Sequence, residues 1–121
     1  MLINDFFNIT SIEHGAVSAT YNVELNGSHT IYKAHFPGNP VTPGVCILQM
    51  ATEILEHHFG KGLAMSYAKR VRYKNMLLPW HKPAFTISKI KEDENKVNVC
   101  VAVEDGEQTF ATMSLAFEWK I

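Results

Sequence analysis

The feature that most constrains the fold of this 121-residue chain is a segment, residues 43–59, with the pattern of a helix that is apolar around most of its circumference. Too many apolar residues are present to share one narrow stripe: Val45, Ile47, Leu48, Met50, Ala51, Ile54, Leu55 and Phe59. We therefore expect the helix to be largely buried and to end at Gly60. At its start, Thr42 is a good N-cap residue and Pro43 is favoured at the first helical position.

The remainder of the chain is rich in segments typical of β-strands. Valine alternates with smaller or polar residues over 96–104, and Asp105-Gly106 is a strong hairpin signal. The predicted strands are residues 9–13, 16–25, 63–74, 84–92, 96–104 and 108–119, and residues 29–34 are also predicted to be extended. An antiparallel sheet curled around one long central helix would cover that helix on several sides. The sequence thus predicts an α+β fold with a single domain, residues 1–121.

Composition excludes several classes of partner. The 11 basic and 12 acidic residues give no overall attraction to nucleic acid or to an anionic membrane. No apolar run approaches the ~20 residues of a membrane span, and no signal peptide is visible. Cys46 and Cys100 lack metal-ligand spacing, so we expect buried free thiols in a reducing compartment, the cytoplasm. The adjacent pair His57 and His58 would diverge on a helix, and we expect no metal site.

A loop rich in proline and glycine leads directly into the helix, with the sequence His35-Phe36-Pro37-Gly38-Asn39-Pro40-Val41-Thr42-Pro43-Gly44-Val45. The prolines fix backbone dihedrals, so the loop can hold His35 in place. An imidazole with a pKa near 6.5 suits a general base at neutral pH. The free amides at the helix N-terminus, beginning with Gly44, attract negative charge or a polarised carbonyl oxygen. These are the parts of a site that handles acyl groups.

This loop resembles the active-site motif of the β-hydroxyacyl-[acyl carrier protein] dehydratases of the hot-dog fold, and weaker similarity extends over residues 8–119. The resemblance implies dehydration of a 3-hydroxyacyl chain to a trans-2-enoyl chain, in fatty-acid or related lipid or polyene biosynthesis. The chain would be carried on the phosphopantetheine of an acyl carrier protein, and no separate cofactor is implied. His35 would act as the base and the Gly44 amide would bind the thioester oxygen. Four residues of this region are expected to bind the substrate: Phe36, Pro43, Val45 and Met50.

The resemblance also implies a homodimer in which the two sheets join and each active site lies at the dimer interface. His35 of one subunit would face the helix of the other. Larger oligomers of such dimers, or a heterodimer with a related chain, are compatible with the same arrangement.

The chain departs from the family pattern on the helix. The family places a carboxylate 14 residues after the histidine, where this chain has Gln49, and Glu53 stands one turn later. An amide is neither an acid nor a base near neutral pH, although it can hold a hydroxyl group or a water by hydrogen bonds. Residues i and i+4 share a helix face, so Glu53 is a candidate for a relocated acid. The sequence leaves the roles of Gln49 and Glu53 open.

Two further features complete the sequence-based picture. A local basic cluster, Lys69, Arg70, Arg72 and Lys74, is a candidate docking site for an acidic carrier protein or an ordinary solvated strand edge. In a strand, the last three would lie on one face.

Because the helix carboxylate is missing, two alternatives to the dehydratase remain: a catalytically weakened subunit that binds an acyl chain or carrier protein, and an acyl thioesterase that recruits Glu53.

Overall fold

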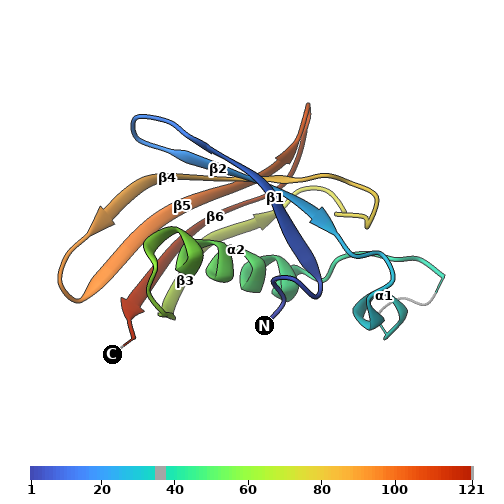
Figure 1. Ribbon diagram of the computed structural model, residues 1–121, viewed down its shortest axis with the longest axis horizontal. Helices are drawn as coiled ribbons and strands as arrows, with labels where there is room; N and C mark the ends of the chain where they lie inside the picture. The colour runs from blue at the N-terminus through green and yellow to red at the C-terminus, as the bar shows by residue number, and fades with distance from the viewer. Residues whose placement is uncertain (35–37, 121) are drawn as a thin grey trace.

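The computed structural model describes residues 1–34 and 38–120, so the predicted roles of His35 and Phe36 concern residues outside the described part of the chain. The elements in chain order are β1 (Phe7–His14), β2 (Ala19–Leu25), α1 (Thr30–Ala34), α2 (Gly44–Phe59), β3 (Leu63–Tyr73), β4 (Ala84–Glu92), β5 (Lys96–Asp105) and β6 (Gln108–Trp119) (Figure 1). The strands form a sheet in the order β1-β2-β4-β5-β6-β3, and every neighbouring pair is antiparallel. The predicted strands are therefore confirmed, with small shifts at their ends.

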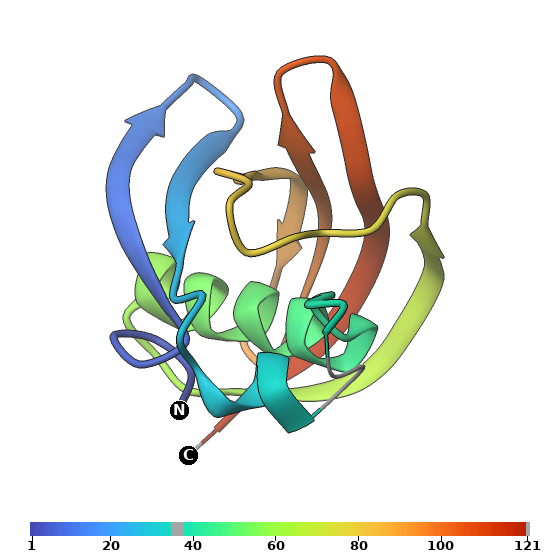
Figure 2. The ribbon, with the colours of Figure 1, turned by 90° about the vertical axis from the view of Figure 1, so that its right-hand side faces the viewer.

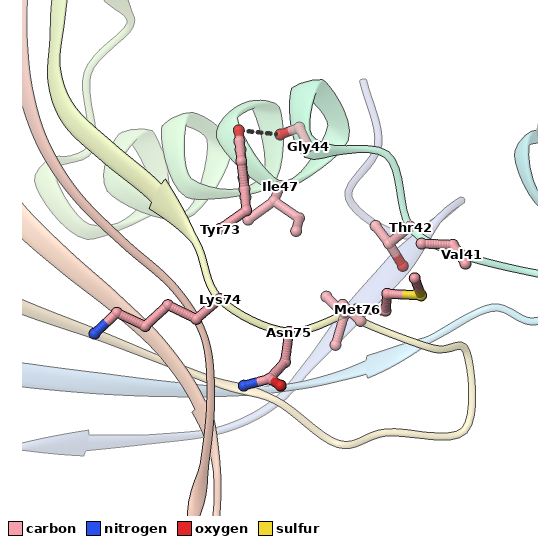
Figure 3. A pocket seen from close by; sticks show the side chains of 9 residues that line it. Val41, Thr42, Gly44, Ile47, Tyr73, Lys74, Asn75 and Met76 are labelled. Carbon is pink, nitrogen blue, oxygen red and sulfur yellow. Dashed lines mark hydrogen bonds between the residues drawn. The ribbon is translucent and has the colours of Figure 1, made fainter.

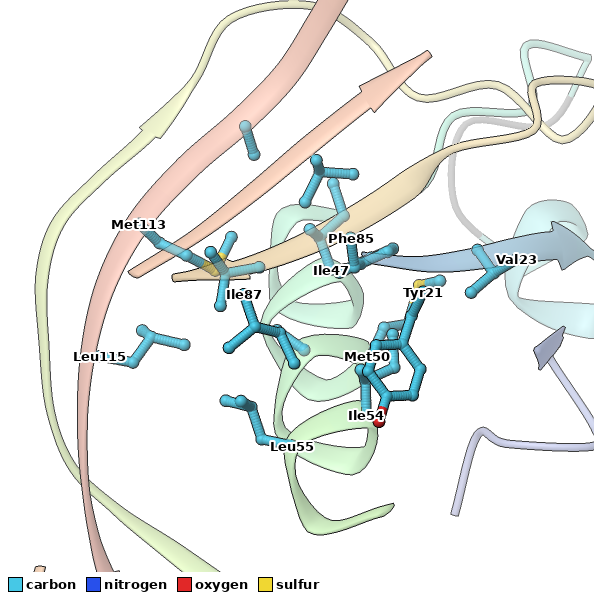
Figure 4. Packing of buried hydrophobic residues seen from close by; sticks show 14 of the residues in the cluster. Tyr21, Val23, Ile47, Met50, Ile54, Leu55, Phe85, Ile87, Met113 and Leu115 are labelled. Atoms are coloured by element: carbon cyan, nitrogen blue, oxygen red, sulfur yellow. The ribbon is translucent and has the colours of Figure 1, made fainter. Parts of the chain in front are cut away.

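The sheet is strongly curved, and α2 lies in its concave side (Figures 1 and 2). Alternate side chains of the strands point inward and interleave with those of the helix, as Ile54, Ile87 and Met113 illustrate (Figure 4). This is the predicted arrangement of an antiparallel sheet with a helix inside it. Helix α2 has 16 residues, and the structure also contains a second helix of five residues. The prediction of one long central helix is therefore not confirmed.

Residues 29–34 are not extended, so that prediction is wrong. Thr30–Ala34 form the short helix α1, whose Tyr32 is buried against the ring of Phe6 at a centroid distance of 5.2 Å. A single helical turn has too little periodicity to be recognised in a sequence, and its stability comes from this tertiary packing.

The start of α2 also differs from the prediction. The helix begins at Gly44 with Pro43 as its N-cap residue, and no side chain caps it. The Thr42 hydroxyl is instead buried and hydrogen-bonded to the hydroxyl of Tyr32 at 2.8 Å. The end is as predicted, because Gly60 adopts a left-handed conformation with φ 69° and its amide donates to the Glu56 carbonyl.

The helix is largely buried, as predicted, but one side of it is uncovered. Most of its apolar side chains are in the core, but Val45 is 72% exposed and Leu48 is half-buried. These residues share one side of α2, which the curved sheet leaves uncovered.

Strand β3 forms one edge of the sheet, and most of its side chains are exposed. Its register against β6 shifts between Lys69 and Arg72, where Arg70 adopts φ 54°. This β-bulge interrupts the regular alternation of side chains. Arg70 and Arg72 nevertheless line one depression on the outer face of the sheet, as predicted for one strand face, whereas Lys74 lies beyond the end of β3. A second shift lies in β4 between Ser88 and Lys91, where Lys89 adopts φ 52°.

Candidate active site

A pocket of about 580 Å³ lies beside the N-terminus of α2 (Figure 3). It is lined by residues from the loop before the helix, from the helix itself and from the end of β3: Val41, Thr42, Gly44, Ile47, Tyr73, Lys74, Asn75, Met76 and Leu77. The apolar members are Val41, Ile47, Met76 and Leu77. Of the polar members, Thr42 and the Tyr73 hydroxyl lie near the helix start, whereas Lys74 and Asn75 lie farther from Gly44 (Figure 3). The predicted helix N-terminus therefore borders a real hollow with an apolar lining.

Tyr73 fixes the helix start from the side of the sheet. Its hydroxyl donates a hydrogen bond of 2.8 Å to the Gly44 carbonyl oxygen (Figure 3). Its ring lies so close to the Gly44 Cα that a Cβ at this position would be only 2.7 Å from the tyrosine Cζ. Burial raises the pKa of Tyr73, which keeps the hydroxyl protonated as a donor. Glycine is thus required here by the close approach of an aromatic ring.

The first amides of α2 face away from the helix. Within the described ranges, the Gly44 and Val45 amides donate no hydrogen bond, whereas those of Cys46 and Ile47 donate to the Pro43 carbonyl. Free amides at a helix N-terminus carry partial positive charge and can bind an oxygen that gains negative charge. The Gly44 amide is therefore free, among the described residues, to donate a hydrogen bond to a ligand oxygen.

A second hollow, of about 450 Å³, follows the uncovered side of α2 toward β3. Its lining is Val45, Leu48, Gln49, Thr52, Glu56, Leu63, Ala64, Met65 and Lys120. Gln49 is exposed on this side, one turn after Val45. The helix start thus separates two hollows, one containing Tyr73 and the other containing Gln49.

Glu53 is directed away from both hollows and holds the N-terminal segment. It is 2% exposed, and its carboxylate accepts hydrogen bonds from the backbone amides of Leu2 and Ile3 at 2.8–2.9 Å. The side-chain amide of Gln49 donates a further bond of 2.9 Å to the same carboxylate. The lone pairs of Glu53 are therefore engaged by groups of this chain, while the Gln49 carbonyl oxygen stays available on the exposed side.

The other predicted substrate-binding residues lie in different surroundings. Pro43 is half-buried at the N-cap position, and Met50 is fully buried in the core among apolar side chains. Tyr73 and Met76 were not predicted, although both line the pocket at the helix start. The only sequence signal for Tyr73 was its place at the end of a predicted strand.

A cluster of aromatic and imidazole rings lies at the opposite end of α2. The buried Tyr21 hydroxyl is 2.9 Å from Nδ1 of His58, and the His58 ring stacks on His14 at a centroid distance of 6.2 Å. Burial lowers the pKa of His58, as do the nearby His14 and His57, against a smaller opposing effect of Glu92. This cluster is separate from the pockets at the helix start.

The fold and the loop–helix site can be compared with known proteins. The family model described as the ApeI dehydratase matches residues 11–114, which is most of the chain. The chain belongs to the ApeI-like dehydratase family. The matched region includes β2 to β5 and the whole of α2.

Relatives of this ApeI-like chain include 3-hydroxyacyl-[acyl-carrier-protein] dehydratases named FabZ. The enzyme from Latilactobacillus sakei subsp. sakei is 31% identical over 97% of this chain and 86% of its own length. The enzyme from Lactiplantibacillus plantarum is 28% identical over 84% of this chain and 73% of its own length. The sequence resemblance to hydroxyacyl-carrier-protein dehydratases is thus confirmed.

Solved structures confirm the hot-dog type of fold. The dehydratase heterocomplex ApeI:P from Xenorhabdus doucetiae superposes with a TM-score of 0.73 at 18% identity, covering 91% of this chain and 96% of that chain. A hypothetical thioesterase from Streptococcus pneumoniae, solved with coenzyme A, superposes with a TM-score of 0.67 at 6% identity, covering 98% and 91%. At these identities the structural likeness concerns the fold alone.

No helix in residues 1–34 and 38–120 is long and apolar enough to span a membrane. In the same ranges, no group of three or more His, Cys, Asp or Glu side chains is arranged to hold a metal ion.

Proposed function

We propose that this ApeI-like chain dehydrates 3-hydroxyacyl thioesters borne on an acyl carrier protein, giving trans-2-enoyl thioesters. The observation that carries the proposal is the free Gly44 amide at the N-terminus of α2, held beside an apolar pocket by Tyr73. The membership in a dehydratase family and the FabZ relatives support the same substrate class.

The proposed reaction breaks one C–H bond and one C–O bond and forms a carbon–carbon double bond. His35 removes the proton α to the thioester, and electron density moves onto the thioester oxygen. The Gly44 amide donates to that oxygen as negative charge develops, a form of stabilisation that commonly contributes several kcal/mol to a rate. The leaving hydroxyl group needs a proton, and the imidazolium formed in the first step can return it, so that water departs.

In this proposal Gln49 orients the substrate and Glu53 is a positioning residue. Gln49 is exposed beside the helix start, where its carbonyl oxygen can accept a hydrogen bond from the 3-hydroxyl group. Glu53 is buried and engaged by the Leu2 and Ile3 amides, which supports a role in holding Gln49 and the N-terminal segment rather than in donating a proton.

A dimer with the sheets joined at β3 would complete this site. The uncovered side of α2, with Val45 and Leu48, and the exposed edge of β3 are adjacent apolar surfaces. A second subunit on these surfaces would bring its own loop, with His35, toward Gln49. The partner is another copy of this chain or a related chain, as in the ApeI:P heterocomplex.

The test is mass spectrometry of 3-hydroxyacyl carrier proteins of several chain lengths after incubation with the purified protein. We expect loss of one water with the unmodified chain, no detectable loss with His35→Ala, and faster loss with Gln49→Glu, which restores the family's carboxylate. The Glu53→Gln variant distinguishes the two possible roles of Glu53. Dehydration should be abolished if Glu53 is the proton donor, and should persist if Glu53 is a positioning residue. Intact substrate with both the unmodified chain and Gln49→Glu would contradict the proposal.

One alternative is supported by a specific observation. The Gln49 side chain is not an acid, and the Glu53 carboxylate is buried and hydrogen-bonded within the chain. These are the properties of a subunit that depends on an active partner. Such a subunit would be inactive alone and would raise turnover when mixed with a related dehydratase. Release of free acid in the same assay would instead identify a thioesterase.

A further inference from the structure

The first residues of the chain form an organised turn that lies beside α2 (Figures 1 and 2). The Leu2 carbonyl oxygen accepts hydrogen bonds from the amides of Asp5 and Phe6, at 3.1 and 2.7 Å. Asn4 adopts the left-handed conformation with φ 66°, which asparagine tolerates better than most residues. Phe6 is fully buried in the core. We call residues 1–6 the N-terminal turn.

The N-terminal turn presents two consecutive backbone amides to a buried carboxylate on α2. The Leu2 amide lies 2.9 Å from both carboxylate oxygens of Glu53, and the Ile3 amide lies 2.8 Å from Oε1. A carboxylate that is only 2% exposed needs donors on its oxygens, and these amides supply them. The position of the Glu53 carboxylate is therefore set by the N-terminal turn as well as by the helix.

The same carboxylate determines which end of the Gln49 side chain faces outward. Oε2 of Glu53 accepts a hydrogen bond of 2.9 Å from the side-chain nitrogen of Gln49, one helical turn earlier. A carboxylate oxygen only accepts hydrogen bonds, whereas the amide of glutamine has one donating end and one accepting end. A reversed Gln49 amide would place two acceptors against each other. The Gln49 carbonyl oxygen is therefore left for the exposed side of α2, where this residue lines a hollow.

We propose that the N-terminal turn is a positioning element of the active site, which acts through Glu53 to hold the Gln49 carbonyl oxygen toward the substrate. The inference rests on the proposed function, in which Gln49 contacts the 3-hydroxyl group. Leu2 and Ile3 do not touch the substrate in this arrangement. Their amides orient a carboxylate, and the carboxylate orients the residue that does.

A fixed acceptor selects ligands that donate a hydrogen bond at the 3-position of the acyl chain. A 3-hydroxyl group can donate to the Gln49 carbonyl oxygen, whereas a 3-oxo group has only acceptor lone pairs and would oppose a second acceptor. An unrestrained Gln49 could turn its NH₂ group toward the 3-oxo group and would bind both ligands. The N-terminal turn thus contributes a discrimination that Gln49 alone could not provide.

Anchoring of the chain end does not by itself require Glu53. The N-terminal turn is already held by the buried Phe6 and by a hydrogen bond of 2.8 Å from the Asn26 amide to the Phe6 carbonyl oxygen. Burial of a charged group costs free energy that an apolar side chain at position 53 would avoid. A carboxylate here does what an apolar side chain cannot, because it joins the backbone amides to Gln49.

Three variants test this series of contacts. Ile3→Pro removes an amide that donates to Glu53, because proline has no backbone N–H. Ile3→Ala is the matched control, since it also shortens the half-buried side chain but keeps the amide. Gln49→Leu removes the acceptor itself at an exposed position, where a substitution has little effect on folding.

The ligands are 3-hydroxyacyl and 3-oxoacyl pantetheine derivatives of equal chain length, with an amide in place of the thioester so that they are not turned over. In titration calorimetry we expect the unmodified protein and Ile3→Ala to bind the 3-hydroxyacyl ligand about tenfold more tightly than the 3-oxoacyl ligand. Ile3→Pro and Gln49→Leu should reduce this ratio to about twofold or less. A loss of stability alone would weaken the binding of both ligands and leave the ratio unchanged. An unchanged ratio in either variant would overturn the proposal.

A measurement without ligand keeps the inference separable from the proposed function. The NMR signals of the Gln49 side-chain amide are identified by their absence in Gln49→Leu, and the exposed Gln108 provides the reference for a solvated glutamine. The Gln49 signals should differ from this reference in the unmodified protein and in Ile3→Ala, and should approach it in Ile3→Pro.

The two possible failures are then distinct. Identical Gln49 signals in Ile3→Pro and Ile3→Ala would overturn the positioning role even if dehydration is observed. The expected signals together with intact substrate would support the positioning role and contradict the proposed function alone.

Discussion

The Tyr73 ring packs against the Gly44 Cα while its hydroxyl donates to the Gly44 carbonyl oxygen at 2.8 Å, so one residue of the sheet edge sets the position of the helix N-terminus. The proposed oxyanion donor is the amide of that same glycine. Changes at either residue should therefore alter the stability of the fold and the alignment of the site together.

Gly44→Ala should destabilise the protein by about 1 kcal/mol, because the new Cβ displaces the tyrosine ring and breaks its hydrogen bond. In a Tyr73→Ala background the same change should stabilise it by about 0.4–1 kcal/mol, since alanine lowers the entropy of the unfolded chain and meets no ring. Urea unfolding of the four proteins of this cycle measures both values. A change of the same sign in both backgrounds would contradict the proposed contact.

Glu53→Gln should lower the free energy of unfolding by about 1.5–3 kcal/mol. The amide replaces an oxygen that accepts hydrogen bonds from the Leu2 and Ile3 backbone with a group that donates them. Chemical denaturation provides the measurement, and hydrogen exchange at the Leu2 and Ile3 amides should accelerate. Glu94→Gln is the matched control, because Glu94 is exposed and the same chemical change there should have almost no effect.

The histidine cluster should make the stability of the protein depend on pH. The pKa of His58 is lower in the folded protein than its ordinary value of 6.5, so the unfolded chain binds the proton more readily. Its contribution is therefore complete above about pH 6.5 and is lost as the pH falls through the lower, folded-state value. Melting temperatures between pH 7.5 and pH 5 should fall more steeply for the unmodified protein than for His58→Gln. Parallel curves would contradict this origin of the pH dependence.

Val45→Asp should weaken the proposed dimer. A carboxylate on the uncovered side of α2 would be buried without a partner when a second subunit covers that side. Light scattering coupled to gel filtration should show a lower mass at a given concentration. Val17→Asp is a suitable control, since Val17 is 83% exposed in the turn between β1 and β2, away from this surface.

Much of the fold could be predicted because its signals are local. The alternation of 96–104 and the apolar surface of 43–59 identify β5 and α2 from a few neighbouring residues. The predictions fail where tertiary contacts determine the local structure. Thr42 has the right chemistry for an N-cap, but Tyr32 takes its hydroxyl, and α1 is stabilised by packing rather than by its own sequence.

The sequence indicated part of the candidate site but little of its geometry. The proline-rich loop and Gly44 carry a recognisable pattern, whereas the partners of Glu53 are backbone amides some 50 positions away that no local pattern reveals. The two β-bulges could not be predicted either, because nothing in the local sequence marks Arg70 or Lys89 as left-handed.

The strand order also determines when the protein can be completed during synthesis. Among the described strands, edge strand β3 pairs with β6 alone, so Leu63 meets its strand partner, Trp119, only after 56 further positions have been synthesised. Until then a nascent chain carries α2 and an unpaired strand with exposed Met65 and Tyr67, a surface prone to association with other chains. The surface that serves the proposed dimer is thus also the surface that a chaperone would need to cover during synthesis.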